Sequence, residues 1–133
     1  MPSASDLLGD RRRVLVTGGA GFIGGAVVRR LLRETTVTVF NLDKMGYASD
    51  LSSIEEVLNE LGEAANDRHR LQKVDLSDAA AVEAAVREAD PDLVMHLAAE
   101  SHVDRSISGP DVFIESNVNG TYNMLQAVRG HYE

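Results

Sequence analysis

The sequence predicts an α/β fold in which parallel strands alternate with helices around one doubly wound sheet. An apolar run, Val14 to Val16, passes through a glycine-rich turn into a segment of helical period. Three further runs of strand length follow, and the second ends in Asp43, 19 residues after Gly24. This alternation predicts right-handed βαβ crossovers and the strand order 3-2-1-4, which is the N-terminal half of a Rossmann-type sheet with flanking helices.

Composition narrows the class of protein. The 133 residues suffice for one small domain with a real core, and we expect a tail at 1–12 before a domain at 13–133. A net charge of −8 argues against nucleic acid as a partner, and the absence of cysteine excludes disulfides and thiolate metal sites. No apolar run approaches the roughly 20 residues of a membrane span. No signal-peptide core is present either, so a cytoplasmic location is expected.

The glycine turn has the spacing of a nucleotide-phosphate cradle. Gly19, Gly21 and Gly24 satisfy the G-x-G-x-x-G pattern, and Gly18, Gly21 and Gly24 recur every three residues. The first glycine allows a tight turn, and Gly21 lets a pyrophosphate approach backbone N–H groups at the positive end of the next helix. Gly24 lets that helix pack close to its strand. The pattern therefore indicates a nucleotide site, although a lone match of this type could also be an ordinary strand-turn-helix.

An acidic residue follows the second strand. A carboxylate about 20 residues after the glycines can accept hydrogen bonds from the adenosine ribose hydroxyls and repel a 2′-phosphate. Asp43 therefore favours NAD over NADP as the cofactor. The adjacent Lys44 weakens this preference, because a cation there could tolerate a phosphate.

Periodicity and turn residues predict the other elements. Strands are expected over 14–16, 36–42, 71–76 and 92–99, and helices over 22–33, 51–61, 78–89 and 111–129. Gly62 should end the second helix, Ser77 should cap the third before Pro91 bars its continuation, and Gly130 should end the last. Gly120 inside the last helix should permit a close contact, and the polar 63–70 segment should be a loop.

The first and last helices each show an apolar stripe. The stripe of the first comprises Ile23, Val27, Val28, Leu31 and Leu32. The stripe of the last comprises Phe113, Val118, Thr121, Leu125 and Val128. We expect both stripes to face the sheet.

Other clusters of reactive residues give weaker evidence for a function. Ser101, His102 and Asp104 have the residue types of a hydrolytic triad, but they lie within four positions, where they cannot easily form the relay. No third ligand with suitable spacing joins His96 and His102, so no metal site is expected, and His96 is interpreted as a satisfied core histidine. Arg105 could equally pair with a carboxylate or reach a phosphate.

Several segments together resemble the extended short-chain dehydrogenase/reductase family, and within it the sugar-nucleotide dehydratases. The resemblance covers nearly the whole chain after Arg13, and its most specific part runs from Leu97 to Ile107. The segments that carry it are Thr17–Gly24, Asp43–Lys44 with Tyr47–Ala48, Asp75–Leu76, His96–Ile107 and Asn117–Thr121. The resemblance implies NAD as cofactor and a nucleotide sugar, dTDP-glucose, as substrate.

The resemblance also assigns individual residues. Phe22 and Ile23 would contact the pyrophosphate alongside Gly18, Gly21 and Gly24, and Asp43, Lys44 and the turn through Gly46 would hold the adenosine ribose. The adenine would lie at Asp75 and Leu76. The nicotinamide side would be formed by Leu97, Ala98, Ala99 and Ser101, with Ser116 replacing a common threonine and Ser101 also touching the glucose. Gly46 departs from the usual threonine, and residues 60–69 look like a surface insertion.

The resemblance further implies chemistry that this chain does not itself carry. Family members use an acid pair on a fifth strand and a Tyr-x-x-x-Lys helix, whereas Tyr47, Tyr122 and Tyr132 have no lysine four positions later. We therefore expect no catalytic residue here and a segment that is inactive alone. The alternatives are a free-standing NAD-binding module or truncated paralogue without chemistry, and another nucleotide-sugar enzyme such as an epimerase.

The predicted order also implies association. The fourth strand would lie at an edge of the sheet, and an apolar edge strand invites pairing with another chain. We therefore expect the isolated chain to self-associate. The family resemblance adds that the full-length protein would be a homodimer.

Overall fold

The computed structural model describes residues 8–45, 51–97 and 120–132, and in them the predicted parallel sheet is confirmed. The strand order is β3-β2-β1-β4, and every pairing is parallel. The strands are β1 (Arg13–Thr17), β2 (Thr38–Leu42), β3 (His69–Gln72) and β4 (Leu93–His96). The helices are α2 (Phe22–Glu34), α3 (Ser52–Leu61), the 3₁₀ helix η1 (Glu63–Arg68), α4 (Ala79–Ala89) and α7 (Gly120–Tyr132).

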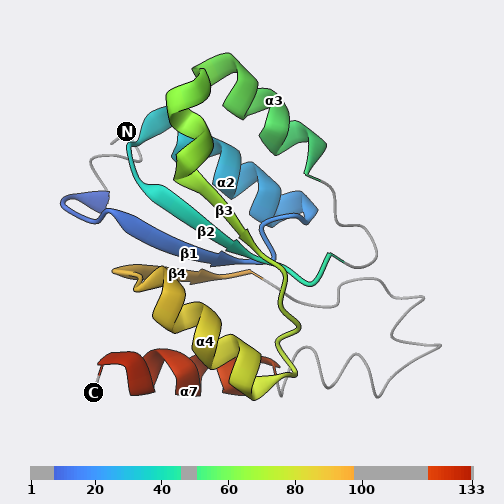
Figure 1. Ribbon diagram of the computed structural model, residues 1–133, viewed down its shortest axis with the longest axis vertical. Coiled ribbons are helices and arrows are strands. Elements are labelled where there is room, and N and C mark those ends of the chain that lie inside the picture. The colour runs from blue at the N-terminus through green and yellow to red at the C-terminus, as the bar shows by residue number, and fades with distance from the viewer. Residues whose placement is uncertain (1–7, 46–50, 98–119, 133) are drawn as a thin grey trace.

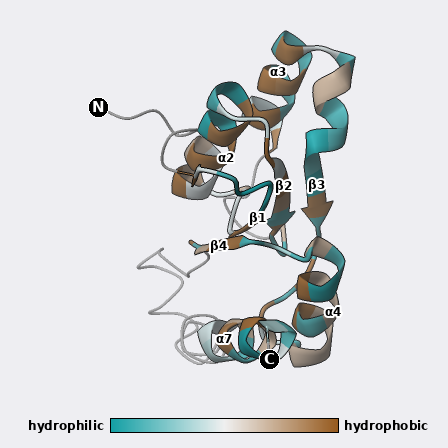
Figure 2. Ribbon diagram, turned by 90° about the vertical axis from the view of Figure 1, so that its left-hand side faces the viewer, coloured by the Kyte–Doolittle hydropathy of each residue, from teal (hydrophilic) through white to brown (hydrophobic). Residues whose placement is uncertain are grey.

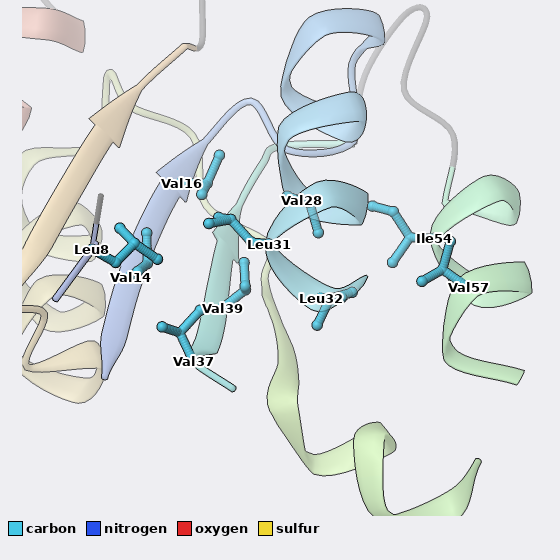
Figure 3. Close-up of a cluster of buried hydrophobic side chains, with 10 residues drawn as sticks. All are labelled: Leu8, Val14, Val16, Val28, Leu31, Leu32, Val37, Val39, Ile54 and Val57. Carbon is cyan, nitrogen blue, oxygen red and sulfur yellow. The ribbon is translucent and has the colours of Figure 1, made fainter. Parts of the chain in front are cut away.

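Two helical layers cover the two faces of the sheet. α2 and α3 lie on one face, and α4 and α7 lie on the other (Figures 1 and 2). Because successive strand residues point to opposite faces, Val14 and Val16 of β1 enter one core and Leu15 enters the other. The first core is drawn in Figure 3. Both faces of β1 are thus buried, which explains its continuous apolar run.

The strand ends are aligned by the register. Thr17 is paired with Leu42 on one side and with His96 on the other, and Leu42 is paired with Gln72. Parallel strands all place their carboxyl ends at one edge, to which the arrows point in Figure 1. The connection from β1 to α2 leaves from this edge. It is therefore the place to look for a ligand site.

Several predicted boundaries were wrong by a few residues. β3 begins at His69, where it pairs with Val39, and it ends at Gln72 instead of continuing to residue 76. The polar segment before it forms η1 instead of a loop. Asp78, not Ser77, caps α4, because its side chain accepts a hydrogen bond from Ala81 N–H while Ser77 binds Asp75.

The last helix also differs from the prediction. α7 continues through Gly130 to Tyr132, so Gly130 does not end it. Its buried positions are Gly120, Met124 and Ala127, whereas Leu125 is exposed, because the buried stripe lies about one residue away from the predicted one. The stripe residues Phe113 and Val118 lie outside the described residues.

Arg68 donates hydrogen bonds to carbonyl groups at the end of α2. The Arg68 guanidinium donates to the carbonyl oxygens of Leu32, Thr35 and Val37, where α2 ends and the chain turns toward β2. The last carbonyl groups of a helix have no partner within it, and a cation there also suits the helix dipole. Burial lowers the pKa of Arg68 from its ordinary value. Arg68 thus joins η1 to the far end of α2.

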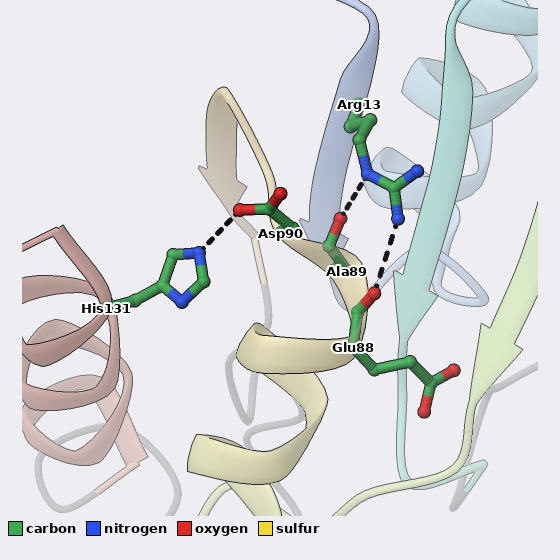
Figure 4. Close-up of polar contacts among 5 residues, drawn as sticks. All are labelled: Arg13, Glu88, Ala89, Asp90 and His131. Carbon is green, nitrogen blue, oxygen red and sulfur yellow. Dashed lines mark hydrogen bonds and ion pairs between the residues drawn. The ribbon is translucent and has the colours of Figure 1, made fainter.

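Arg13 and Asp90 lie where α4 ends. Arg13 donates to the carbonyl oxygens of Ala89 (2.6 Å) and Glu88 (3.3 Å), and its guanidinium lies 4.8 Å from the centre of the Phe40 ring. Asp90 ends α4 with a left-handed φ of 41° and binds His131 of α7 at 2.7 Å (Figure 4). These contacts fix α4 to the amino end of β1 and to α7.

β4 is an edge strand of the sheet that the structure describes. Its four residues are half-buried, and β1 is the only described strand that pairs with it. The self-association expected from such an edge stays a prediction. In the same ranges, no helix has the length and apolar character that would let it cross a membrane.

The Arg68 contacts predict a large effect of substituting this half-buried arginine. Arg68→Ala should lower the free energy of unfolding by about 2 kcal/mol, because hydrogen bonds from a charged group contribute roughly that amount and three carbonyls lose their donor. Urea unfolding measures the change. Arg70→Ala is the matched control, since Arg70 is exposed and donates only to Asp67 in the described contacts. Equal stability of the two variants would contradict the prediction.

Candidate functional site

The candidate site is built around the turn between β1 and α2. Gly18 adopts a left-handed φ of 74° and donates to the Leu42 carbonyl at 2.8 Å, so the turn is held against the end of β2. Gly21 N–H donates to Gly18 at 3.1 Å and closes the turn. Left-handed backbone favours glycine, and here this requirement falls on Gly18.

Gly19 and Gly24 are required for space. A Cβ on Gly24 would overlap the carbonyl oxygen of Gly18, which is backbone and cannot rotate away. A Cβ on Gly19 would overlap the carboxamide of Asn41, a fully buried side chain of β2. The first turn of α2 is therefore in close contact with the glycine turn, and the glycine turn is in close contact with β2.

The N-terminus of α2 is suited to an anion. Gly21 is its N-cap and supplies no side chain, and the first turn of the helix carries no acidic residue. The first N–H groups of a helix lack partners within it and lie at the positive end of the dipole, so they can bind a phosphate. The structure thus has the local chemistry that the glycine pattern predicts.

Phe22 and Ile23 form an apolar rim beside this N-terminus. Their exposed fractions are 94% and 67%, so the predicted placement of Ile23 on the buried stripe of α2 was wrong. The buried face of α2 instead comprises Gly24, Gly25, Val28, Leu31 and Leu32. Neither side chain belongs to a core cluster of the described residues.

Asp43 connects the glycine turn to β2. The residue is 8% exposed, and its Oδ2 accepts from Ala20 N–H at 3.1 Å while its Oδ1 accepts from Met45 N–H at 2.7 Å. Each carboxylate oxygen can accept more than one hydrogen bond, so these contacts are compatible with binding ribose hydroxyls. The residue predicted to recognise a ligand therefore also helps to hold the turn.

Asp75 and Leu76 lie in the segment after β3. Asp75 accepts from Ser77 N–H at 3.0 Å and from Ser77 Oγ at 2.8 Å. The Ser77 N–H holds the pKa of Asp75 below its ordinary value, and the Lys44 charge acts in the same direction. Leu76 is buried against α4 and α7, so a ligand could reach only its backbone.

A polar chain joins β1, β4 and α7 at the same edge. His96 Nδ1 lies 2.6 Å from Thr17 Oγ1, and His96 Nε2 lies 2.9 Å from Thr121 Oγ1. Burial lowers the pKa of His96. The interpretation of His96 as a satisfied histidine agrees with these contacts. Sequence reasoning did not identify its partners, although Thr17 directly precedes the glycine turn.

Sequence reasoning also missed Asn41. It is the polar residue between Phe40 and Leu42, and that placement inside an apolar strand was the available signal. Its Nδ2 lies 3.2 Å from His69 Nε2, and its Oδ1 has no hydrogen-bond partner among the described residues. Burial also lowers the pKa of His69.

The remaining predicted residues lie at or beyond the end of β4. Leu97 is 37% exposed, and its N–H donates to Thr17 Oγ1 at 2.9 Å and to the Thr17 carbonyl at 3.1 Å. Gly46, Ala98, Ala99, Ser101 and Ser116 lie outside the described residues, and their assigned roles stay predictions.

Comparisons with known proteins match the chain to nucleotide-sugar dehydratases and epimerases. Residues 15–133 match the family model described as GDP-mannose 4,6 dehydratase. The chain is 48% identical over 122 residues to a dTDP-glucose 4,6-dehydratase of Neisseria meningitidis, covering 92% of this chain and 33% of that protein. The chain spans about a third of the length of the curated relatives it matches.

Solved structures of a dehydratase and of an epimerase both match this chain. A dTDP-glucose 4,6-dehydratase of Streptomyces venezuelae, solved with NAD bound, matches with a TM-score of 0.77 and 40% identity over 90% of this chain and 36% of that one. A UDP-glucose 4-epimerase of Thermus thermophilus, solved in complex with NAD, matches with a TM-score of 0.71 and 36% identity over 90% of this chain and 34% of that one.

Two neighbouring glycines of α2 give a matched test of the turn. Gly24→Ala should lower the free energy of unfolding by about 2 kcal/mol or more, because the new methyl group meets the Gly18 carbonyl. Gly25→Ala should be neutral or stabilising by up to about 1 kcal/mol, because its nearest neighbours stand at 3.5 and 3.7 Å and alanine favours helix. Urea unfolding measures both variants, and a Gly24→Ala protein as stable as Gly25→Ala would refute this account of the turn.

Proposed function

This chain belongs to the GDP-mannose 4,6 dehydratase family, and from that premise we propose that it forms the NAD-binding part of a dTDP-glucose 4,6-dehydratase. One observation supports this most strongly. The uncapped N-terminus of α2 lies beside a carboxylate, Asp43, that is bonded to the same glycine turn. A dinucleotide requires these two groups close together, one for its pyrophosphate and one for its ribose.

We assign the parts of the cofactor to successive strand ends. The pyrophosphate lies at the N-terminus of α2, with Phe22 and Ile23 shielding it from water. Asp43 and Lys44 hold the adenosine ribose together with Gly46, and Asp75 and the backbone of Leu76 hold the adenine. The segment from Leu97 to Ser101 faces the nicotinamide, joined by Ser116, and Ser101 also contacts the glucose.

The proposed reaction is an internal redox cycle of the sugar. NAD, when bound, would supply the hydride acceptor for oxidation at C4 and the hydride donor for reduction at C6, with loss of water across C5 and C6 between the two. The residues of this chain bind and orient the dinucleotide at the carboxyl edge of the sheet. We assign none of them as the acid or base, because no tyrosine here is followed by lysine four positions on.

We also propose that the whole protein assembles as a homodimer. The outward face of α7 carries Tyr122, Leu125 and Tyr132, which are 61%, 65% and 57% exposed. Large exposed apolar side chains on one helix face suit an interface with a second copy. Sedimentation of the whole protein should therefore give a dimer.

The experiment for the reaction uses the protein that contains this sequence in its source cell. It is incubated with dTDP-glucose carrying deuterium at C4, and the product is analysed by mass spectrometry and NMR. We expect loss of one water and deuterium at C6 in a 4-keto-6-deoxy sugar. A product of unchanged mass would favour an epimerase, and tight NAD binding without turnover would favour a binding module.

Cofactor choice provides a prediction for the chain itself. Asp43→Asn should weaken NAD binding at least about tenfold, or ~1.4 kcal/mol. The substitution removes the charged acceptor for the ribose hydroxyls. It also places an amide NH₂ group where one carboxylate oxygen now accepts a hydrogen bond from a backbone N–H. The ratio of NADP affinity to NAD affinity should rise, because repulsion of the 2′-phosphate disappears.

Isothermal titration calorimetry with NAD and NADP measures both affinities. Asp78→Asn is the matched control, since it makes the same chemical change at an N-cap where asparagine also functions. Unchanged selectivity in Asp43→Asn would remove Asp43 from the proposed ribose site.

A further inference from the structure

We propose that His96 is a positioning residue that links the first turn of α7 to the nicotinamide side of the dinucleotide site. This inference rests on the proposed function for the identity of the ligand. It concerns a side chain that the assignment above leaves without a role. The ring lies between two hydroxyl groups from two other elements, and both of its nitrogens are engaged.

The positions of the three residues carry the argument. Thr17 is the last residue of β1 and directly precedes Gly18, where the glycine turn begins. His96 is the last residue of β4 and directly precedes Leu97. One side-chain contact of 2.6 Å therefore joins the starting points of two segments, one assigned to the pyrophosphate and the other to the nicotinamide.

Two side-chain hydrogen bonds tie α7 to this edge, in addition to its core packing against α4. Thr121 lies in its first turn, and the 2.9 Å contact between Thr121 Oγ1 and His96 Nε2 reaches across 25 positions of sequence. Asn123 adds a 2.8 Å bond from the same end of α7 to the carbonyl of Leu76. The start of α7 is thus tied to the segment after β3 and to the end of β4.

A neutral ring satisfies this arrangement best. A neutral imidazole offers one donor and one acceptor, and a hydroxyl on each side can match either tautomer. An imidazolium offers two donors, and Thr17 Oγ1 already accepts from Leu97 N–H. Protonation would therefore remove the Nδ1 acceptor that the neutral Nε2–H tautomer offers to Thr17, and the Thr17 hydroxyl hydrogen would have to turn to another acceptor.

The direction of the pH effect follows from burial. The ring contacts the hydroxyls of Thr17 on β1 and Thr121 on α7, and desolvation lowers the pKa of His96 below its ordinary value of about 6.5. The unfolded chain then binds the proton more readily than the folded one as the pH falls through that value. The contribution of His96 is fully present above about pH 6.5 and declines below it.

The test compares two ligands and three substitutions of His96. NAD and ADP share the adenosine half, and only NAD carries the nicotinamide nucleoside. For His96→Ala we expect NAD affinity to fall about tenfold while ADP affinity changes by less than about twofold. His96→Asn keeps an amide at the place of Nδ1 and His96→Gln keeps one at the place of Nε2, so each should retain part of the NAD affinity.

His131→Ala is the matched control for loosening α7. His131 lies on the same helix but binds Asp90 at its far end (Figure 4), so its loss should leave both affinities as in the wild type. Equal losses for NAD and ADP in His96→Ala, or the same loss in His131→Ala, would show a merely structural role and overturn the proposal. Unchanged NAD affinity in His96→Ala would overturn it as well.

Measurements on the unmodified chain keep the proposal testable if the variants do not fold. The ratio of NAD to ADP-ribose affinity should fall as the pH is lowered through the pKa of His96, which burial places below its ordinary value of about 6.5. ADP-ribose is used here because, like NAD and unlike ADP, it has no terminal phosphate that titrates in this range. Long-range NMR of the ring should show one protonated nitrogen at neutral pH and a shift with NAD but not with ADP. A ratio independent of pH would overturn the inference, whereas a chain that binds neither ligand would refute the proposed function itself.

Discussion

The hydrogen bonds between the glycine turn and the end of β2 are the constraint on which the site depends. Gly18 N–H reaches Leu42, and Ala20 N–H reaches the Asp43 carboxylate, so the turn follows wherever β2 places it. The position of the turn therefore sets the position of the N-terminus of α2 at the carboxyl edge of the sheet. A ligand that binds the helix N-terminus and Asp43 together would engage a geometry that the fold itself has already formed, which reduces the ordering cost of binding.

The parallel sheet and its order could be predicted from sequence because both rest on local patterns. The apolar run of β1, the β-branched run of β2 and the glycine spacing are visible within a few residues. Boundaries were less accessible, because β3 begins where His69 finds Val39 on another strand. The capping of α2 by Arg68 could not be predicted either, since the guanidinium and its Leu32 carbonyl are separated by 36 positions.

The candidate site was predicted in part for the same reason. Gly18, Gly24 and Asp43 carry recognisable spacing, and the structure gives each of them a specific contact. Thr17, Asn41 and Thr121 have no pattern of their own. Their importance comes from side chains meeting between elements, as when His96 meets hydroxyls 79 positions before it and 25 after it.

Polar residues gather where all four strands end, and this distribution separates the functional edge from the rest of the core. Thr17, Gln72 and His96 end their strands, and Asn41 and Asp43 flank the last residue of β2. Burying such groups costs free energy unless they are paired, and the Oδ1 of Asn41 and the Oε1 of Gln72 have no partner among the described residues. A sequence selected for stability alone would place apolar residues there. Earlier in β1 and in β2, the buried residues are apolar. The polar residues lie at the edge where we propose that the dinucleotide binds. Proteins commonly sacrifice some stability at a functional site, so the cost of burying these groups is expected there.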